Sequence, residues 1–129
     1  MIARDVMTRE VVTVSPALAV KELAKVFVKH RISGAPVVDK KGKIIGVVSE
    51  ADILMKKGKE VKNIMSRKVI QVTEQTTVEA IASLMTHHNI KRVPVMEEGK
   101  LLGIVSRADI IRAIAMGKHI ALHTPVYDL

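Results

Sequence analysis

The chain has 129 residues, of which 48% are apolar and none is cysteine, and its formal net charge is +8. The lack of cysteine excludes disulfides and thiolate metal sites, and no apolar run approaches the roughly 20 residues that a membrane helix needs. Because the first residues also lack the apolar segment of a secretory signal, we expect a soluble cytoplasmic protein with no membrane contact, and its positive charge favours an anionic partner.

An internal repeat accounts for almost the whole chain. Residues 5–8, Asp-Val-Met-Thr, return as residues 63–66, Asn-Ile-Met-Ser. Residues 46–53 return in the same way as residues 103–110. A repeat of this length is a complete supersecondary unit rather than a short solenoid turn. We therefore expect two repeats and an unrepeated tail, at residues 1–58, 59–117 and 118–129.

Each repeat is expected to begin with a strand and a helix. β-Branched residues predict the strand, at 11–14 and again at 69–72. Helix-start signals follow at 15–16 (Ser-Pro) and 76–77 (Thr-Thr). Apolar residues then recur at i, i+3, i+4 and i+7, which predicts amphipathic helices with one core-facing stripe. The stripes consist of Val20, Leu23, Ala24 and Phe27 in the first repeat and of Val78, Ile81, Ala82 and Met85 in the second.

Two strands joined by a charged glycine turn follow each of these helices, and a second helix closes each repeat. The strands are expected at 35–38, 43–48, 93–96 and 101–105, and the closing helices at Ser49 and Ser106. Because one repeat alone would leave its apolar sheet face in water, the two must pack together. We predict an α+β fold in which two β-α-β-β-α repeats pack about a pseudo-twofold axis as one compact module.

The strongest local signal is a Ser-x-x-Asp motif at the start of each closing helix. It comprises Ser49 and Asp52 in the first repeat and Ser106 and Asp109 in the second. One interpretation is structural, because a serine N-cap with an acid three residues later forms a capping box. The other is functional, because the N–H groups and the serine hydroxyl suit a phosphate, and the carboxylate can accept from both ribose hydroxyls. A cleft between the packed repeats would hold such sites as a quasi-equivalent pair.

A pair of cations, Lys91 and Arg92, precedes the first hairpin strand of the second repeat. These cations either belong to a solvated surface or contact a phosphate, since a guanidinium and an ammonium both bind that group. The first repeat has Ser33 and Gly34 at the same place. The two sites are therefore electrostatically unequal.

Other classes of function find less support. A basic nucleic-acid-binding module could use Lys56, Lys57, Lys59 and Lys62, but the chain has only one Phe and one Tyr for base stacking. No phosphate loop, nucleophile elbow or cysteine nucleophile indicates catalysis. No set of three metal ligands is evident either. We therefore expect no enzyme activity, no metal and no cofactor, and an interaction scaffold with vestigial sites stays a further hypothesis.

In order and spacing these motifs resemble the CBS domain, named for cystathionine β-synthase. The resemblance rests on the Asp-Val-Met-Thr opening, on h-x-x-h-Pro-Val-h and on Gly-h-h-Ser-x-x-Asp-h, where h is apolar. Their double occurrence resembles the CBS pair, or Bateman module. The resemblance implies a regulatory sensor of AMP, ADP, ATP or S-adenosylmethionine that often forms a homodimer. It also implies either a stand-alone sensor or a module that regulates a separate protein in trans.

The resemblance further implies roles for individual residues. The ribose hydroxyls would be held by Asp52 and Asp109, and the phosphate would be met by Ser49, Ser106, Lys91 and Arg92. The adenine would lie against the backbone around Ala35 and Val93, between the apolar side chains of Ile32, Val47, Ile90 and Ile104, with Gly34 leaving room. The first repeat departs from the AMP-sensing pattern because it lacks the basic pair, which leaves open whether one or both sites fill.

Overall fold

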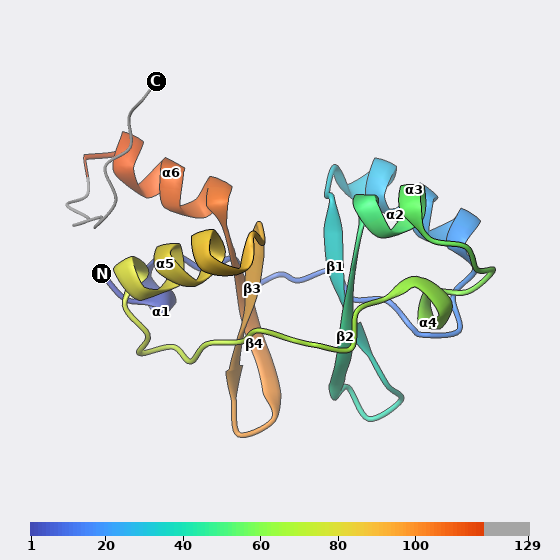
Figure 1. Ribbon diagram of the computed structural model, residues 1–129. Coiled ribbons are helices and arrows are strands. Elements are labelled where there is room, and N and C mark those ends of the chain that lie inside the picture. The colour runs from blue at the N-terminus through green and yellow to red at the C-terminus, as the bar shows by residue number, and fades with distance from the viewer. Residues whose placement is uncertain (118–129) are drawn as a thin grey trace. The chain divides into compact units, whose positions relative to one another are not determined.

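The computed structural model describes residues 1–117, which form two compact units (Figure 1). The tail predicted at 118–129 lies outside the described residues. Of the described residues, unit 1 contains 1–9, 70–98 and 102–117, and unit 2 contains 10–69 and 99–101. Each unit thus combines most of one repeat with the opening segment of the other.

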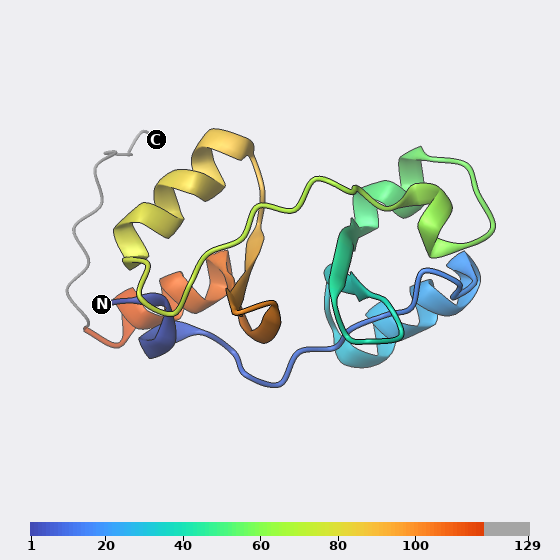
Figure 2. The same cartoon turned by 90° about the horizontal axis from the view of Figure 1, so that it is seen from below.

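Unit 2 contains a two-stranded antiparallel sheet of β1 (Gly34–Val38) and β2 (Ile44–Ser49). Its helices are α2 (Val20–His30), α3 (Glu50–Met55) and α4 (Val61–Ile64). The helices lie on one side of the hairpin (Figures 1 and 2). They enclose a core of Val14, Leu23, Phe27, Ala35, Val37, Val48, Val61, Ile64 and Met65.

Unit 1 repeats this plan with β3 (Arg92–Glu97) and β4 (Lys100–Ser106), which pair in a second two-stranded sheet. Its helices are α1 (Ala3–Val6), α5 (Val78–His88) and α6 (Arg107–Ala115). The core consists of Ala3, Val72, Val78, Ile81, Met85, Val93, Val95, Val105 and Ile110. The mixture of helices and short strands confirms the predicted α+β class.

The predicted helix stripes face these cores. Leu23 and Phe27 of α2 are buried, and so are Val78, Ile81 and Met85 of α5. Burying one such side chain stabilises a fold by about 1.5–3 kcal/mol relative to leaving it exposed. The apolar periodicity therefore predicted both helices and their buried faces correctly.

The predicted first strands at 11–14 and 69–72 are wrong as continuous strands. Only Val14 and Val72 pair, each in an isolated parallel bridge, with Val37 and Val95 respectively. β-Branched residues favour extended backbone, but a strand also needs a partner along its length. Each segment meets the neighbouring strand at a single bridge, so no ladder forms.

The structure also contains two short helices that the periodicity did not predict. In addition, one predicted helix begins later in the sequence than expected. α1 and α4 each end within a copy of the opening motif and contain its first two residues, and four residues are too few for a periodic signal. The Ser-Pro signal instead opens a turn, in which the Ser15 hydroxyl accepts from the Ala17 amide, and α2 begins only at Val20. Among residues 1–117 no helix has both the length and the apolar character needed to cross a membrane.

The opening motif of each repeat packs against a glycine in the second hairpin strand of the other repeat, within one unit. A Cβ atom at Gly103 would lie 2.8 Å from the Thr8 carbonyl oxygen, and one at Gly46 would lie 2.7 Å from the Ser66 carbonyl oxygen. Real Cβ atoms do not approach so closely, so this backbone contact requires glycine. Thr8 and Ile104 also exchange backbone hydrogen bonds of 2.8 and 2.9 Å. This contact fixes residues 1–9 within unit 1.

Candidate functional site

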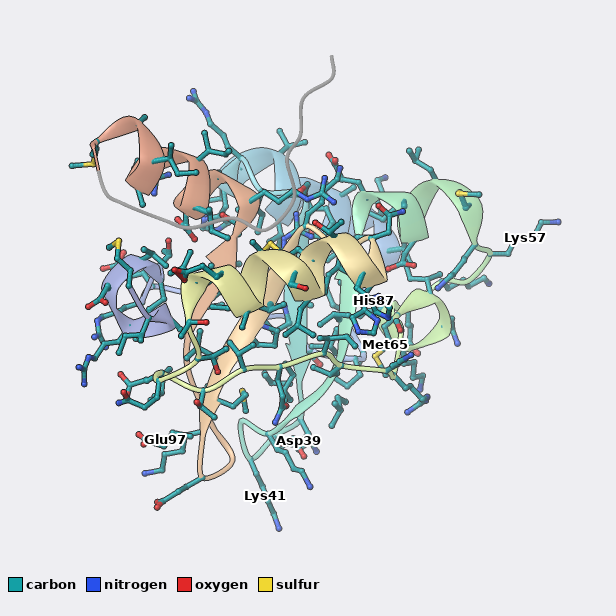
Figure 3. All side chains as sticks on the ribbon, turned by 60° about the vertical axis from the view of Figure 1, so that its left-hand side comes forward. Asp39, Lys41, Lys57, Met65, His87 and Glu97 are labelled. Carbon is teal, nitrogen blue, oxygen red and sulfur yellow. The ribbon has the colours of Figure 1, made fainter. Side chains whose placement is uncertain are left out.

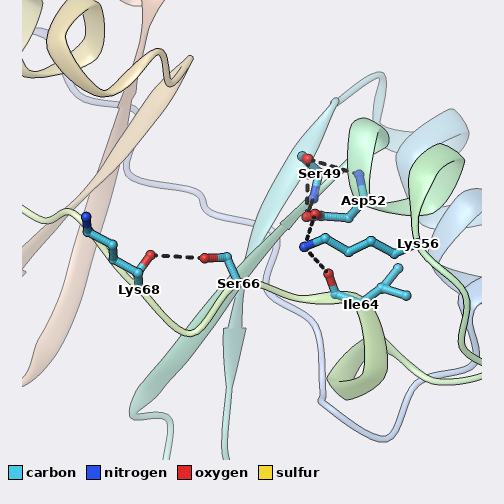
Figure 4. Close-up of polar contacts among 6 residues, drawn as sticks. All are labelled: Ser49, Asp52, Lys56, Ile64, Ser66 and Lys68. Carbon is cyan, nitrogen blue, oxygen red and sulfur yellow. Dashed lines mark hydrogen bonds and ion pairs between the residues drawn. The ribbon is translucent and has the colours of Figure 1, made fainter.

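In unit 2 the Ser-x-x-Asp motif forms a complete capping box at the start of α3 (Figure 4). The Ser49 amide donates to Asp52 Oδ2 at 2.9 Å, and the Asp52 amide donates to Ser49 Oγ at 3.4 Å. The other carboxylate oxygen, Oδ1, lies 2.8 Å from Lys56 Nζ. Lys56 also donates to the Ile64 carbonyl at 3.1 Å. The lysine therefore ties this carboxylate to the end of α4.

Unit 1 builds the same box at the start of α6 but completes it differently. The Ser106 amide donates to Asp109 Oδ2 at 2.9 Å, and the Asp109 amide donates to Ser106 Oγ at 3.1 Å. Asp109 Oδ1 accepts from the Thr8 hydroxyl at 3.1 Å and from Arg112 Nη1 at 3.0 Å. The structural interpretation of the motif is thus confirmed in both units. In each, one carboxylate oxygen is engaged by the cap and the other by side chains alone.

Backbone hydrogen bonds hold the residues before each hairpin beside the capping box. The Arg107 amide donates to the Lys91 carbonyl in unit 1, and the Glu50 amide donates to the Ser33 carbonyl in unit 2, both at 2.9 Å. Glu50 and Arg107 are the first residues of α3 and α6. The segment with Lys91 and Arg92 therefore lies directly against the start of α6.

The predicted site residues fall into one set per unit. Unit 2 contains Ile32, Gly34, Ala35, Val47, Ser49 and Asp52, and unit 1 contains Ile90, Lys91, Arg92, Val93, Ile104, Ser106 and Asp109. The register of β1 and β2 pairs Gly34 with Ser49 and Pro36 with Val47. Gly34 and Ala35 are buried, whereas Ile32 and Val47 are half-buried. The backbone groups predicted to meet an adenine are thus flanked by partly accessible apolar side chains.

Two hydroxyl residues, Thr8 and Ser66, were missed as candidates. Thr8 reaches Asp109 across 101 positions of sequence. Its repeat-mate Ser66 is bonded by its backbone to Val47, and its hydroxyl donates to the Lys68 carbonyl at 3.4 Å (Figure 4). The repeated Met-Thr and Met-Ser pairs could have indicated Thr8 and Ser66 as candidates. Periodicity, however, does not reveal that they lie beside the hairpin of the other repeat.

The connector lysines predicted for nucleic-acid binding are partly neutralised. Lys56 is paired with Asp52, and Lys62 Nζ lies 3.2 Å from a Glu60 carboxylate oxygen. Lys57 extends from the connector into solvent (Figure 3). Two of the four lysines therefore have local carboxylate partners, and the basic surface is smaller than the composition suggested.

Comparison with known proteins identifies both repeats. A sequence model of the CBS domain matches residues 3–58 and again residues 61–116. The crystal structure of the CBS domain pair of protein MJ0100, in complex with 5′-methylthioadenosine and S-adenosyl-L-methionine, shares 32% identity, with a TM-score of 0.85, and covers 92% of this chain and 98% of that one. The structure of CBSX2 in complex with AMP shares 28% identity, with the same TM-score of 0.85 and the same coverage of 92% and 98%.

Curated relatives include much longer proteins. The L-aspartate semialdehyde sulfurtransferase of Methanocaldococcus jannaschii is 33% identical over 115 residues, which are 86% of this chain and 23% of the enzyme. The chain thus spans about a quarter of that relative's length.

Proposed function

The chain belongs to the CBS-domain family as a tandem pair, and on this premise we propose that it is a regulatory sensor that binds an adenine nucleotide, namely AMP, ADP or ATP. Each unit supplies one site, built around its capping-box carboxylate. The module acts without enzymatic activity of its own, in the cytoplasm, on a separate protein in trans.

The convergence of Thr8, Lys91 and Asp109 in unit 1 carries the proposal. A ribose offers two hydroxyl donors, and Asp109 Oδ1 is an acceptor that only side-chain donors engage. The Arg112 donor can exchange for a ribose hydroxyl while the Thr8 hydrogen bond and the cap, which uses Oδ2, are both kept. Lys91 is exposed beside the start of α6, where it is available to a phosphate. AMP occupies a relative of the same fold.

Such a ligand would couple the two repeats. Thr8 belongs to the first repeat and Asp109 to the second, and both lie in unit 1. A ligand that contacts both strengthens this packing. It shifts the equilibrium between two arrangements only to the extent that it binds one of them more tightly. Regulation of a partner would follow from that difference in affinity.

Exposed apolar side chains support homodimer formation. Leu54 and Met55 of α3 are each 83% exposed, and Val28 of α2 is 79% exposed. Large apolar side chains gathered on neighbouring helices often mark protein interfaces. We expect sedimentation velocity to give the mass of a dimer that Leu54→Asp converts to a monomer. A monomeric wild-type chain would contradict homodimer formation.

Calorimetric titration of the nucleotide-free chain with AMP and ATP tests the proposed function. We expect saturable binding that Asp109→Asn weakens about tenfold or more, because a hydrogen bond to a charged group is lost. Asp39→Asn is the matched control. Asp39 accepts two amide hydrogen bonds in the turn between β1 and β2, outside the site.

Lys91→Met offers a second variant, since Lys91 is exposed and its loss leaves the fold intact. Equal affinities in wild type, Asp109→Asn and Lys91→Met would remove the proposed site.

A duplex oligonucleotide titrated at two salt concentrations tests the alternative of a basic nucleic-acid-binding module, for which affinity would fall steeply with salt.

A further inference from the structure

We propose that unit 2 binds a free α-amino acid with an apolar side chain, in a hollow between the end of α2 and the start of α3. The hollow has a volume of about 290 Å³, and the two helices lie beside each other (Figure 1). Its lining consists of Phe27, Val28, Arg31, Ile32, Ser33 and Glu50. This volume is at the low end of small-molecule sites, which span roughly 300–1,000 Å³, so the ligand is small.

The hollow is distinct from the nucleotide site proposed for the same unit. Of the residues predicted to surround an adenosine, it includes only Ile32, and neither Ser49 nor Asp52 lines it. An amino acid in the hollow would therefore leave the capping box of α3 untouched. Its binding does not depend on the proposed nucleotide sites.

One cation and one carboxylate stand at this hollow. Arg31 and Glu50 are both exposed, and neither forms an ion pair with another residue in the described part of the chain. A planar guanidinium binds a carboxylate through two parallel hydrogen bonds, and a carboxylate accepts from an ammonium. A free amino acid carries both complementary groups on one carbon. A ligand with two charges of the same sign would instead be repelled by one of the two side chains.

Apolar side chains form the rest of the wall. Phe27 belongs to the core of unit 2, Ile32 is half-buried and Val28 is 79% exposed. A ligand side chain that covers Val28 removes apolar surface from water, which is favourable. The hollow therefore favours an amino acid of the size and character of leucine over glycine.

The backbone of Arg31 is unusual for an arginine. Arg31 ends α2 in the left-handed conformation, with a φ of 54°, and its amide donates to the carbonyls of Phe27 and Val28. Its repeat-mate at the end of α5 is Asn89, with a φ of 52°. Glycine and asparagine adopt this conformation with less strain than arginine does. A side chain that binds a ligand gives a reason for arginine at this strained position.

Unit 1 lacks the chemistry of this hollow. Its equivalent positions hold Met85, Thr86, Asn89, Ile90, Lys91 and Arg107. None of these side chains is a carboxylate, so the ammonium of an amino acid would have no acidic partner there. We therefore expect one amino acid per chain.

Titration of the isotope-labelled full chain with L-leucine, followed by NMR amide shifts, tests the proposed site. We expect saturable shifts that are largest at Arg31, Ser33 and Glu50. Isopentylamine, isocaproate and glycine are the matched probes, because they lack the carboxylate, the ammonium and the apolar side chain of leucine respectively. We expect each probe to bind about fivefold more weakly than leucine, since each loses one contact at a partly exposed site.

Substitutions assign each charge of the ligand to its partner. We expect Arg31→Gln to weaken leucine binding about fivefold without weakening isopentylamine, which has no carboxylate to lose. Glu50→Gln weakens leucine in the same way without weakening isocaproate. Lys29→Gln and Glu22→Gln are the matched controls. They remove exposed charges of α2 that do not line the hollow, and leave leucine affinity within about twofold.

Three results would overturn the amino-acid site. The first is the absence of saturable shifts both in wild type and in Leu54→Asp, which is expected to keep a second copy from covering Val28. The second is an equal loss of leucine and isopentylamine affinity in Arg31→Gln, since Arg31 would then act on the fold and not on the carboxylate. The third is the loss of leucine shifts in AMP-saturated protein, which would make the hollow part of the nucleotide site. Leucine shifts in protein that fails to bind AMP would leave the amino-acid site standing without the proposed function.

Discussion

The helix that closes unit 1 is anchored in its core, whereas its counterpart in unit 2 lies on the surface. α6 has nine residues and buries Asp109, Ile110 and Ala113. α3 has six residues and buries none. Both begin with the same capping box, so the cap starts a helix in either setting. The cap does not determine how firmly that helix packs, because packing depends on the apolar residues after it.

The carboxylates of the two Ser-x-x-Asp motifs also differ, both in their burial and in their partners. The Asp109 side chain is 4% exposed and accepts from a threonine of the opening segment, whereas the Asp52 side chain is 14% exposed and is held by Lys56. Duplication has preserved the hydrogen bonds of the cap in both units. The partners of the second oxygen have diverged. Equivalent positions in a repeat therefore need not be equivalent sites.

The largest expected loss of stability comes from substitution of Gly46 and Gly103, the two glycines that lie closest to backbone oxygens of the opening motifs. We expect Gly103→Ala and Gly46→Ala each to lower the free energy of unfolding by about 1–3 kcal/mol, since a new Cβ would press on backbone oxygens at 2.8 and 2.7 Å. Gly103→Ala also displaces Thr8 from Asp109, so it weakens nucleotide binding in unit 1. Urea denaturation and calorimetry measure the two effects.

Gly42→Ala separates close approach from backbone conformation. Gly42 has a φ of 79°, and a Cβ there meets nothing within 4 Å. Its substitution costs stability through the left-handed backbone alone and leaves nucleotide affinity unchanged. If Gly103→Ala left both stability and binding at wild-type values, the close packing of the opening segment would be disproved.

Local patterns predicted most of the secondary structure. The stripes of α2 and α5, the two hairpins and the serine caps of α3 and α6 all depend on residues close in sequence, and the structure confirms them. Hydrophobic periodicity depends only on residues that are close in sequence, so it predicts such features well. The β-branched composition of 11–14 and 69–72 predicted strands that do not form, because a strand also depends on a distant partner, which composition does not reveal.

The site was predicted only in part for a related reason. The residues around each capping box were found because they lie on one helix start and one hairpin. Thr8 was missed because its contact with Asp109 depends on packing between opposite ends of the chain. Lys56 was assigned to the connector from its basic neighbours, and its bond to Asp52 required the end of α3 to be known. Pairing of the units about a pseudo-twofold axis stays a prediction.

The smallest expected effect comes from the cations that hold the two carboxylates. We expect Lys56→Met to lower the free energy of unfolding by about 0.5–1 kcal/mol and Arg112→Met by less, because both side chains are partly exposed, at 46% and 62%. Asp109 keeps the Thr8 hydroxyl when Arg112 is removed. Removal of Lys56 takes the cation from Asp52 and one donor from the Ile64 carbonyl.

Urea denaturation at low and high salt measures this difference, and Lys25→Met provides its control. Lys25 pairs with Glu22 on the surface of α2, where both side chains are more than half exposed, so its removal costs almost nothing. The loss in Lys56→Met shrinks as salt screens the ion pair, but the part due to the Ile64 carbonyl persists because screening acts on charges. Equal losses in Lys56→Met and Arg112→Met would mean that the second contact of Lys56 adds no stability. The two carboxylates would then differ in burial and in the Thr8 hydrogen bond of Asp109.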